Sequence, residues 1–133
     1  MRTPDRILRD SKSIAVVGIS ASPERDSHRV ARYLREHGYQ INPVNPELDE
    51  VLGLKCYPSL RDVPEPVDVV DVFRRSEHLV PIAQDAVAIK AKVLWLQLGI
   101  MNDAARELAE HAGLDVVMDQ CTMALHMRLI ARR

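Results

Sequence analysis

The chain has 133 residues, of which 47% are hydrophobic, and its formal net charge is −1. This length is typical of one domain that needs no disulfide, and the balanced charge indicates neither a nucleic acid nor a membrane surface as a partner. The apolar runs are too short to span a bilayer, and residues 1–10 lack the hydrophobic region of a signal peptide. Cys56 and Cys121 form no CxxC pair, so we expect a cytoplasmic protein with free thiols.

Predicted strands and helices alternate along the chain. Short runs rich in Val, Ile and Leu predict strands at 13–18, 39–44, 67–73, 92–97 and 114–118. Helical spacing and capping residues predict helices at 27–37, 76–91, 102–112 and 121–131, with one helical turn at 59–63. This order predicts the α/β class: a Rossmann-like, doubly wound parallel sheet of about five strands with helices on both faces. We expect residues 1–133 to form a single domain.

Ligands of such sheets bind beyond the carboxyl ends of the strands, so the loops that follow the strands are the candidate sites. The loop after the first strand has one glycine, Gly18, and is not GxGxxG. It offers the hydroxyls of Ser20 and Ser27, the cation of Arg25 and the free N–H groups of the next helix, which together suit a phosphate or pyrophosphate. The alternative is that Ser27 is only a helix N-cap and Arg25 only a surface charge.

Asn45 follows the second predicted strand and lies between Pro43 and Pro46. A dinucleotide-binding domain usually has an acidic residue here to hold a ribose hydroxyl, so the neutral Asn45 argues against NAD. The prolines predict a stiff, uncharged rim, or a rigid turn and nothing more.

The third and fourth strand ends carry an aromatic residue, arginines and a glutamine. Phe73, Arg74 and Arg75 could pack on a purine and grip a phosphate, or be a core aromatic with two solvated cations. Gln97 ends an apolar strand and is expected to face the crevice, and Gly99 allows a ligand to approach the backbone or simply forms a turn.

Cys121 begins the last predicted helix, where a thiol can be reactive, although a buried structural cysteine is the alternative. The five histidines form no catalytic or metal-binding set, and we expect His28 to be solvated. Trp95 is expected to belong to the core.

Taken together, segments 14–20, 43–46, 72–74, 95–100 and 119–121 resemble, in order and spacing, the small stand-alone CoA-binding proteins. Those are similar to the N-terminal domain of the succinyl-CoA synthetase α subunit. The resemblance implies that coenzyme A (CoA) lies across the strand ends. It places the pyrophosphate, the nucleotide with its 3′-phosphate, and the pantetheine arm in that order along the loops. The residues expected at the ligand are Gly18, Ile19, Ser20, Ala21, Arg25, Ser27, Val44, Asn45, Pro46, Phe73, Arg74, Gln97, Gly99 and Cys121.

By position, Gly18, Ser20 and Arg25 correspond to the pyrophosphate, and Phe73 with Arg74 to the adenosine and its 3′-phosphate. Asn45 and Pro46 correspond to the border of the nucleotide, and Gln97 and Gly99 to a pantetheine path toward Cys121. Asp26 is a departure that would disfavour a phosphate, so its side chain is not expected to point inward.

These features predict a protein that binds CoA or an acyl-CoA for storage, sensing or regulation and is not itself a catalyst. The synthetase carries its phosphohistidine in a second domain, so synthetase chemistry is not expected. One alternative is a thiol-dependent enzyme that acts on CoA thioesters or CoA disulfides through Cys121. An NAD-binding module is the other alternative and is disfavoured.

Overall fold

The computed structural model describes residues 1–131, which are built around a parallel sheet of five strands in the order β2-β1-β5-β6-β7. The strands are β1 (Ser13–Val17), β2 (Gln40–Val44), β5 (Val69–Val72), β6 (Val93–Leu96) and β7 (Asp115–Val117). Each of these strands lies within a predicted segment, and every neighbouring pair in the sheet is parallel. The predicted Rossmann-like α/β fold is confirmed.

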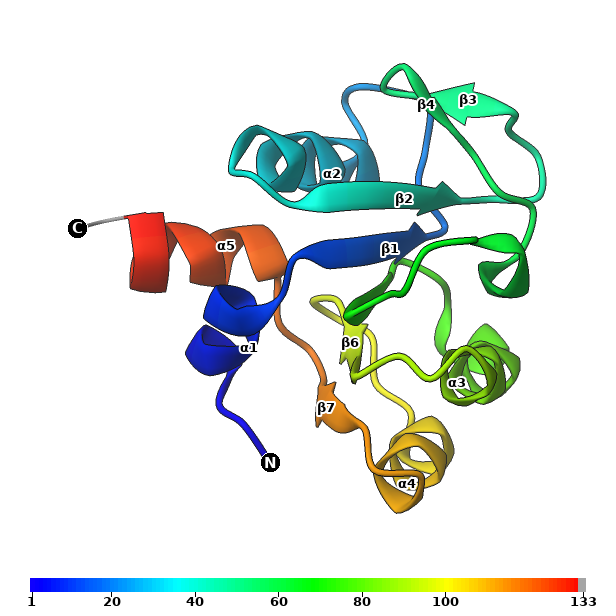
Figure 1. Cartoon of the computed structure of the whole chain (residues 1–133), viewed down its shortest axis with the longest axis vertical. Coiled ribbons are helices and arrows are strands. Elements are labelled where there is room, and N and C mark those ends of the chain that lie inside the picture. Colours follow the sequence, from blue (N-terminus) through cyan, green and yellow to red (C-terminus); the bar gives the residue numbers. More distant parts are fainter. Residues whose placement is uncertain (132–133) are drawn as a thin grey trace.

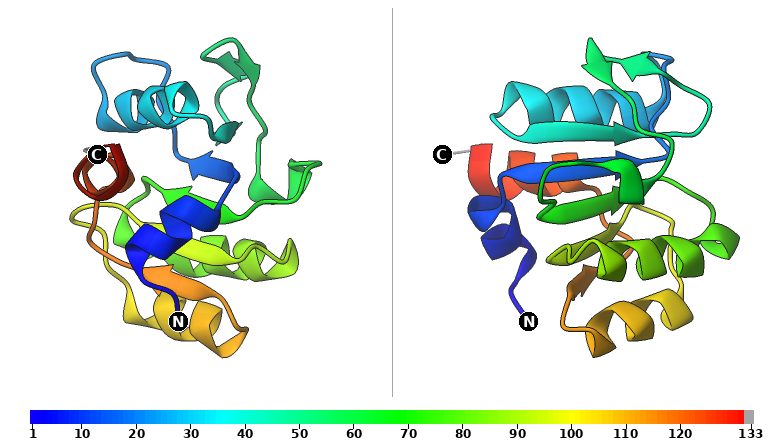
Figure 2. Two further views of the ribbon diagram at one scale, coloured as in Figure 1. Left: turned by 60° about the vertical axis from the view of Figure 1, so that its left-hand side comes forward. Right: turned by 45° about the vertical axis from the view of Figure 1, so that its right-hand side comes forward.

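Helices cover both faces of this sheet (Figure 1). One face packs against α1 (Pro4–Asp10), α2 (Asp26–Glu36) and α5 (Thr122–His126), around buried residues such as Leu34 and Trp95. The other face packs against α3 (Leu79–Ala88) and α4 (Asp103–His111), around residues such as Ala83 and Leu94. Figure 2 shows the same layers from two other directions. Because side chains alternate along a strand, consecutive residues of each strand serve opposite cores.

The helix boundaries follow local chemistry. The Asn102 side chain accepts a hydrogen bond from the Ala105 N–H at 2.9 Å and begins α4. Helix α3 is preceded by a short 3-10 turn, η2 (Ser76–His78), and ends earlier than predicted, because Lys90 adopts a φ of 60°. The last helix is also different: α5 is short and continues as a π-helical turn at Met127–Ala131.

The sequence analysis missed helix α1 and the hairpin of β3 (Glu50–Val51) and β4 (Leu54–Lys55). Helix α1 buries Ile7 and Leu8 completely. Proline is common at the first position of a helix, so Pro4 is a sequence signal for α1, but the sequence analysis assigned no helix to this charged segment. The hairpin turns through Leu52 and Gly53, both with positive φ. Leucine is an unusual residue for this conformation, so the turn had no clear sequence signature.

No helix among residues 1–131 is both long enough and apolar enough to cross a membrane.

Candidate functional site

The carboxyl ends of β1 and β5 meet at Gly18. Its N–H donates to the Val44 carbonyl at 2.9 Å, and its φ is 86°. A Cβ at this position would lie 2.8 Å from Cδ of Arg74 and 3.0 Å from the Phe73 carbonyl oxygen. Glycine is therefore required both by the backbone conformation and by the close approach of the loop after β5.

Asn45, at the end of β2, ties two strand ends together. Its Nδ2 donates to the Ile19 carbonyl at 2.8 Å, and its Oδ1 accepts from the Glu47 N–H at 2.8 Å. A carboxylate at this position could not donate to the Ile19 carbonyl. The hydrogen bond to Ile19 thus explains why a neutral residue occupies position 45. The Ile19 side chain, one of the residues expected at the ligand, is wholly buried in the core.

The loop after β1 is shaped by its own side chains. Ser27 Oγ accepts from the Ser20 N–H at 2.9 Å, and Ser20 Oγ accepts from the Ser22 N–H at 3.0 Å. His28 Nδ1 lies 2.9 Å from the Ser20 carbonyl oxygen and its side chain is buried, so the expectation that His28 is solvated is wrong. The suggestion that Ser27 is an N-cap is also wrong, because α2 begins at Asp26 with Arg25 in the N-cap position.

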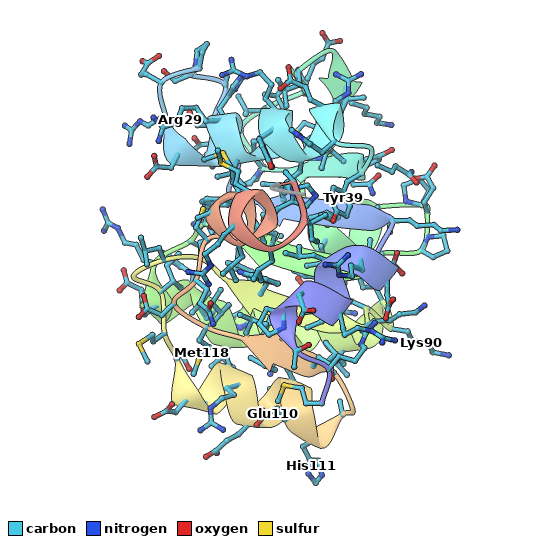
Figure 3. The ribbon with its side chains drawn as sticks, turned by 90° about the vertical axis from the view of Figure 1, so that its left-hand side faces the viewer. Arg29, Tyr39, Lys90, Glu110, His111 and Met118 are labelled. Carbon is cyan, nitrogen blue, oxygen red and sulfur yellow. The ribbon has the colours of Figure 1, made fainter. Side chains whose placement is uncertain are left out.

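Charged side chains border this loop. Arg25 is exposed and Arg74 is half-buried beside Gly18. Asp26 is exposed and pairs with Arg29, and both residues line the hollow that also contains Phe73 and Cys121. The expectation that the Asp26 side chain does not point inward stays a prediction. Figure 3 shows Arg29 at the edge where the strands end, on the same side as Met118, with Lys90 at the opposite edge.

Three adjoining hollows lie along the strand ends, with volumes of about 240, 330 and 380 Å³. We call them the Val44 hollow, the Arg75 hollow and the Cys121 hollow. The Val44 hollow has largely apolar walls, among them Val17, Val44, Pro46, Leu60 and Ile82. The Arg75 hollow is formed by Gly18, Phe73, Arg74, Arg75 and His78. The Cys121 hollow is lined among others by Phe73, Gln97, Leu98, Ile100, Cys121 and Met123.

The three hollows share walls and cross the sheet edge. Gly18, Arg74 and His78 belong to both the Val44 and the Arg75 hollows, and Phe73 belongs to both the Arg75 and the Cys121 hollows. The crossing lies between β1 and β5, where the chain reverses its direction of winding. This is the switch point at which open α/β sheets bind ligands.

A buried polar cluster lies under the Cys121 hollow. Gln97 Nε2 donates to Asp71 Oδ1 at 2.5 Å and to Thr122 Oγ1 at 2.8 Å, and the Thr122 hydroxyl donates to Asp71 Oδ2 at 3.0 Å. Asp71 is fully buried in β5, and this burial raises the pKa of its carboxyl group to about 7. The sequence analysis missed Asp71, although a carboxylate inside an otherwise apolar strand is a visible signal.

The remaining expected residues have mixed outcomes. Trp95 is wholly buried, as expected, and its Nε1 donates to the Gln120 carbonyl at 2.8 Å. Gln97 lines the Cys121 hollow but is almost wholly buried. Gly99 is exposed, and its N–H donates to Asp119 Oδ1 at 2.7 Å. Sequence reasoning did not select His78, which lies in the 3-10 turn η2 after β5 and lines two of the hollows.

The structure thus brings Gly18, Val44, Pro46, Phe73, Arg74, Gln97 and Cys121 to the walls of the hollows. Ile19, Ser20, Ala21 and Arg25 belong to the loop that follows Gly18, and Ser27 lies in the first turn of α2; none of the five lines the three hollows. Among residues 1–131, no group of three or more His, Cys, Asp or Glu side chains is placed to hold a metal ion.

The structure belongs to the class of open α/β proteins whose ligands bind at the switch point, and comparison with known families narrows this class. Residues 12–127 match the family described as the CoA binding domain. The chain therefore belongs to the CoA-binding domain family, and the predicted resemblance is confirmed. Membership supports CoA binding in general.

The relatives include both stand-alone proteins and parts of larger enzymes. The chain is 44% identical over 120 residues to an uncharacterized protein of Bacillus subtilis, YneT, covering 90% of this chain and 89% of the relative. It is 30% identical over 121 residues to acetate–CoA ligase [ADP-forming] I of Archaeoglobus fulgidus, which covers 83% of this chain but only 18% of the ligase. A solved structure of a hypothetical protein from Pyrococcus horikoshii superimposes with a TM-score of 0.93 at 43% identity, covering 97% of this chain and 93% of that one.

Proposed function

We propose that the chain binds CoA, or an acyl-CoA, in an extended form across the edge of the sheet. The adenine lies in the Val44 hollow, the phosphates lie at the Arg75 hollow and the pantetheine arm runs through the Cys121 hollow. The observation that carries this proposal is the continuity of the three hollows through Gly18 and Phe73. The Arg75 hollow, with its cations, shares residues with two hollows whose walls are more apolar, which fits the charged centre of CoA between its base and its neutral arm.

The Val44 hollow suits a purine. Val17, Val44, Pro46 and Leu60 provide flat, rigid and apolar surfaces for the faces of the base. The stiffness of the segment around Pro46 means that little conformational entropy is lost when a ligand orders this wall.

The Arg75 hollow suits phosphates, because Arg74, Arg75 and His78 supply cationic or donor groups to a small space. Arg25 and Ser20, in the loop after β1, are proposed to face the pyrophosphate. NAD is disfavoured, because the position after β2 where a dinucleotide-binding domain has an acidic residue holds Asn45, whose side chain is bonded to Ile19 and Glu47.

We propose a role in storage, delivery, sensing or regulation of CoA by residues 1–133 acting as one domain. His126 is the histidine closest to Cys121 in the chain, and its Nδ1 pairs with the Tyr33 hydroxyl at 2.8 Å rather than with the thiol. His126 Nδ1 is engaged by Tyr33, and a role of His126 as a base for Cys121 is not part of this proposal. A second candidate is thiol exchange with oxidised CoA, favoured by the position of Cys121 in the wall of its hollow.

Calorimetric titration with CoA, dephospho-CoA, acetyl-CoA and NAD under identical conditions tests the proposal. We expect measurable binding of CoA and none of NAD. Weaker binding of dephospho-CoA would place the 3′-phosphate at the arginines. Equal affinity for CoA and NAD would refute the proposed function, because the site would then read only what the two ligands share.

A further inference from the structure

Asp71 is the side chain of the sheet whose burial is energetically most unfavourable. It is fully buried in β5, and both of its hydrogen-bond partners, Gln97 and Thr122, are neutral. An acidic group without a cation in the interior of a protein is strongly unfavourable, and valine would serve the strand better. Asp71 therefore needs an explanation beyond the stability of the fold.

The hydrogen bonds of Asp71 determine how the Gln97 amide is oriented. Both amide hydrogens on Nε2 are used, one by Asp71 Oδ1 and the other by Thr122 Oγ1. The Thr122 hydroxyl in turn donates to Asp71 Oδ2, which closes the cluster. An amide has nearly the same shape when it is rotated by 180°, so these two acceptors decide which end of Gln97 faces them.

The opposite end of the amide is left for the Cys121 hollow. Gln97 lines this hollow, and with Nε2 committed to the interior, Oε1 is the polar atom that remains for a ligand. The walls of this hollow include the apolar side chains of Phe73, Ile100 and Met123, and the Asp26–Arg29 pair also belongs to its lining. A nearly buried acceptor such as Gln97 Oε1 favours ligands that bring an N–H group, because an unpaired polar atom there is unfavourable.

We propose that Gln97 Oε1 accepts a hydrogen bond from an amide N–H of the pantetheine arm, and that Asp71 and Thr122 are positioning residues that hold this acceptor toward the ligand. The assignment rests on the proposed function, since it takes the arm to lie in the Cys121 hollow. It gives the site a means to recognise the arm itself, separately from the nucleotide. It also explains why a carboxyl group is kept inside an apolar strand.

Two ligands separate recognition of the arm from recognition of the nucleotide. CoA carries both parts, whereas adenosine 3′,5′-bisphosphate carries the base and phosphates without the arm. A neutral hydrogen bond contributes about 1 kcal/mol, so Gln97→Leu should lower the affinity for CoA about 5-fold and leave the affinity for the bisphosphate unchanged. Asp71→Leu removes the acceptor that orients the amide and should have the same effect.

Asp71→Asn is the matched conservative variant, because its side-chain oxygen can still accept from Gln97 Nε2. We expect it to keep CoA affinity within about 2-fold of the wild type, since it retains the hydrogen bond to Gln97 that Asp71→Leu removes. If Asp71→Asn loses as much affinity as Asp71→Leu, or if Gln97→Leu weakens both ligands equally, the assignment is overturned. Failure of the wild type to bind CoA would refute the proposed function as well, so the two failures are distinguishable.

A measurement on the wild type guards against a variant that fails to fold. The side-chain NH₂ signals of Gln97 in an amide-detected NMR spectrum, identified by their loss in Gln97→Leu, should exchange slowly with solvent because Asp71 and Thr122 hold both hydrogens. They should shift when CoA is added and stay in place when adenosine 3′,5′-bisphosphate is added. Rapid exchange, or an equal shift with both ligands, would contradict the proposed orientation.

Discussion

Replacing Asp71 with asparagine tests how strongly the fold disfavours the ionised form of this buried carboxyl group. Burial raises the pKa of Asp71 from 3.8 to about 7, and its hydrogen bonds from Gln97 and Thr122 only partly oppose the shift. In the unfolded chain the group returns to its ordinary value. The folded state therefore holds a proton that the unfolded state has released over the interval between the two values.

The magnitude follows from this difference of about three units. Each unit corresponds to about 1.4 kcal/mol, so the contribution of Asp71 to the free energy of unfolding falls by about 4 kcal/mol from pH 4 to pH 8. The sign is that of a raised pKa: stability is fully present below pH 4 and is lost as the pH rises through about 7. Asparagine does not titrate, so Asp71→Asn should gain on the wild type by this amount over the same interval.

Urea unfolding of the two proteins at a series of pH values between 4 and 8 measures this difference directly, because every other titrating group is common to both. Asp49→Asn is the control for the removal of a carboxyl group, since Asp49 is exposed. A difference between Asp71→Asn and the wild type that stays constant from pH 4 to pH 8 would show that the carboxyl group is not perturbed as the structure implies.

Three further predictions concern the ligand. Gly18→Ala should abolish CoA binding in calorimetry, because the added Cβ would displace the Arg74 side chain. Gly113→Ala is the control and should keep binding, since Gly113 has a similar positive φ but open space around its Cβ. Equal binding by the two variants would refute the role of the close approach at Gly18. Arg74→Ala should weaken CoA by about 1–3 kcal/mol and dephospho-CoA by less, and an identical loss for both ligands would show that Arg74 does not read the 3′-phosphate. Oxidised CoA should form a mixed disulfide as the Cys121 thiolate attacks its S–S bond and releases one CoA thiolate, an adduct visible in the intact mass. The adduct should vanish in Cys121→Ser and persist in Cys56→Ser, since Cys56 is buried and burial raises its thiol pKa; an adduct that follows Cys56 would reject the prediction.

The architecture could be predicted from the sequence because its signals are local and repeated. Most strands of the sheet carry apolar, β-branched residues, as Ser13–Val17 does, and helices such as α4 begin at a recognisable cap, Asn102. The hairpin could not be predicted, because Leu52 adopts a positive φ that its side chain disfavours and only tertiary contacts impose. His28 was misplaced for a similar reason, since its partner is the Ser20 carbonyl and a helical pattern does not show such a contact.

The candidate site could be predicted in outline, because parallel strands bring their carboxyl ends to one edge whatever the details of packing. The roles of individual residues were harder to predict. Ser27 and Asn45 looked like ligand groups, yet their polar atoms bond to Ser20 and to Ile19 and thereby shape the loop. A sequence does not distinguish a serine or asparagine that hydrogen-bonds to a neighbouring backbone group from one that hydrogen-bonds to a phosphate.

Phe73 illustrates how one residue joins the two halves of the site. It packs against the core that faces α2 and α5, yet it also borders both the Arg75 and the Cys121 hollows. The residue before it, Val72, faces the opposite core with Val44 and Leu60, because side chains alternate at the end of the strand. A ligand that passes over this strand end therefore moves from one face of the sheet to the other at a single residue. Gly18 lies beside this strand end, and its missing Cβ is what lets the Phe73 carbonyl and the Arg74 side chain approach so closely.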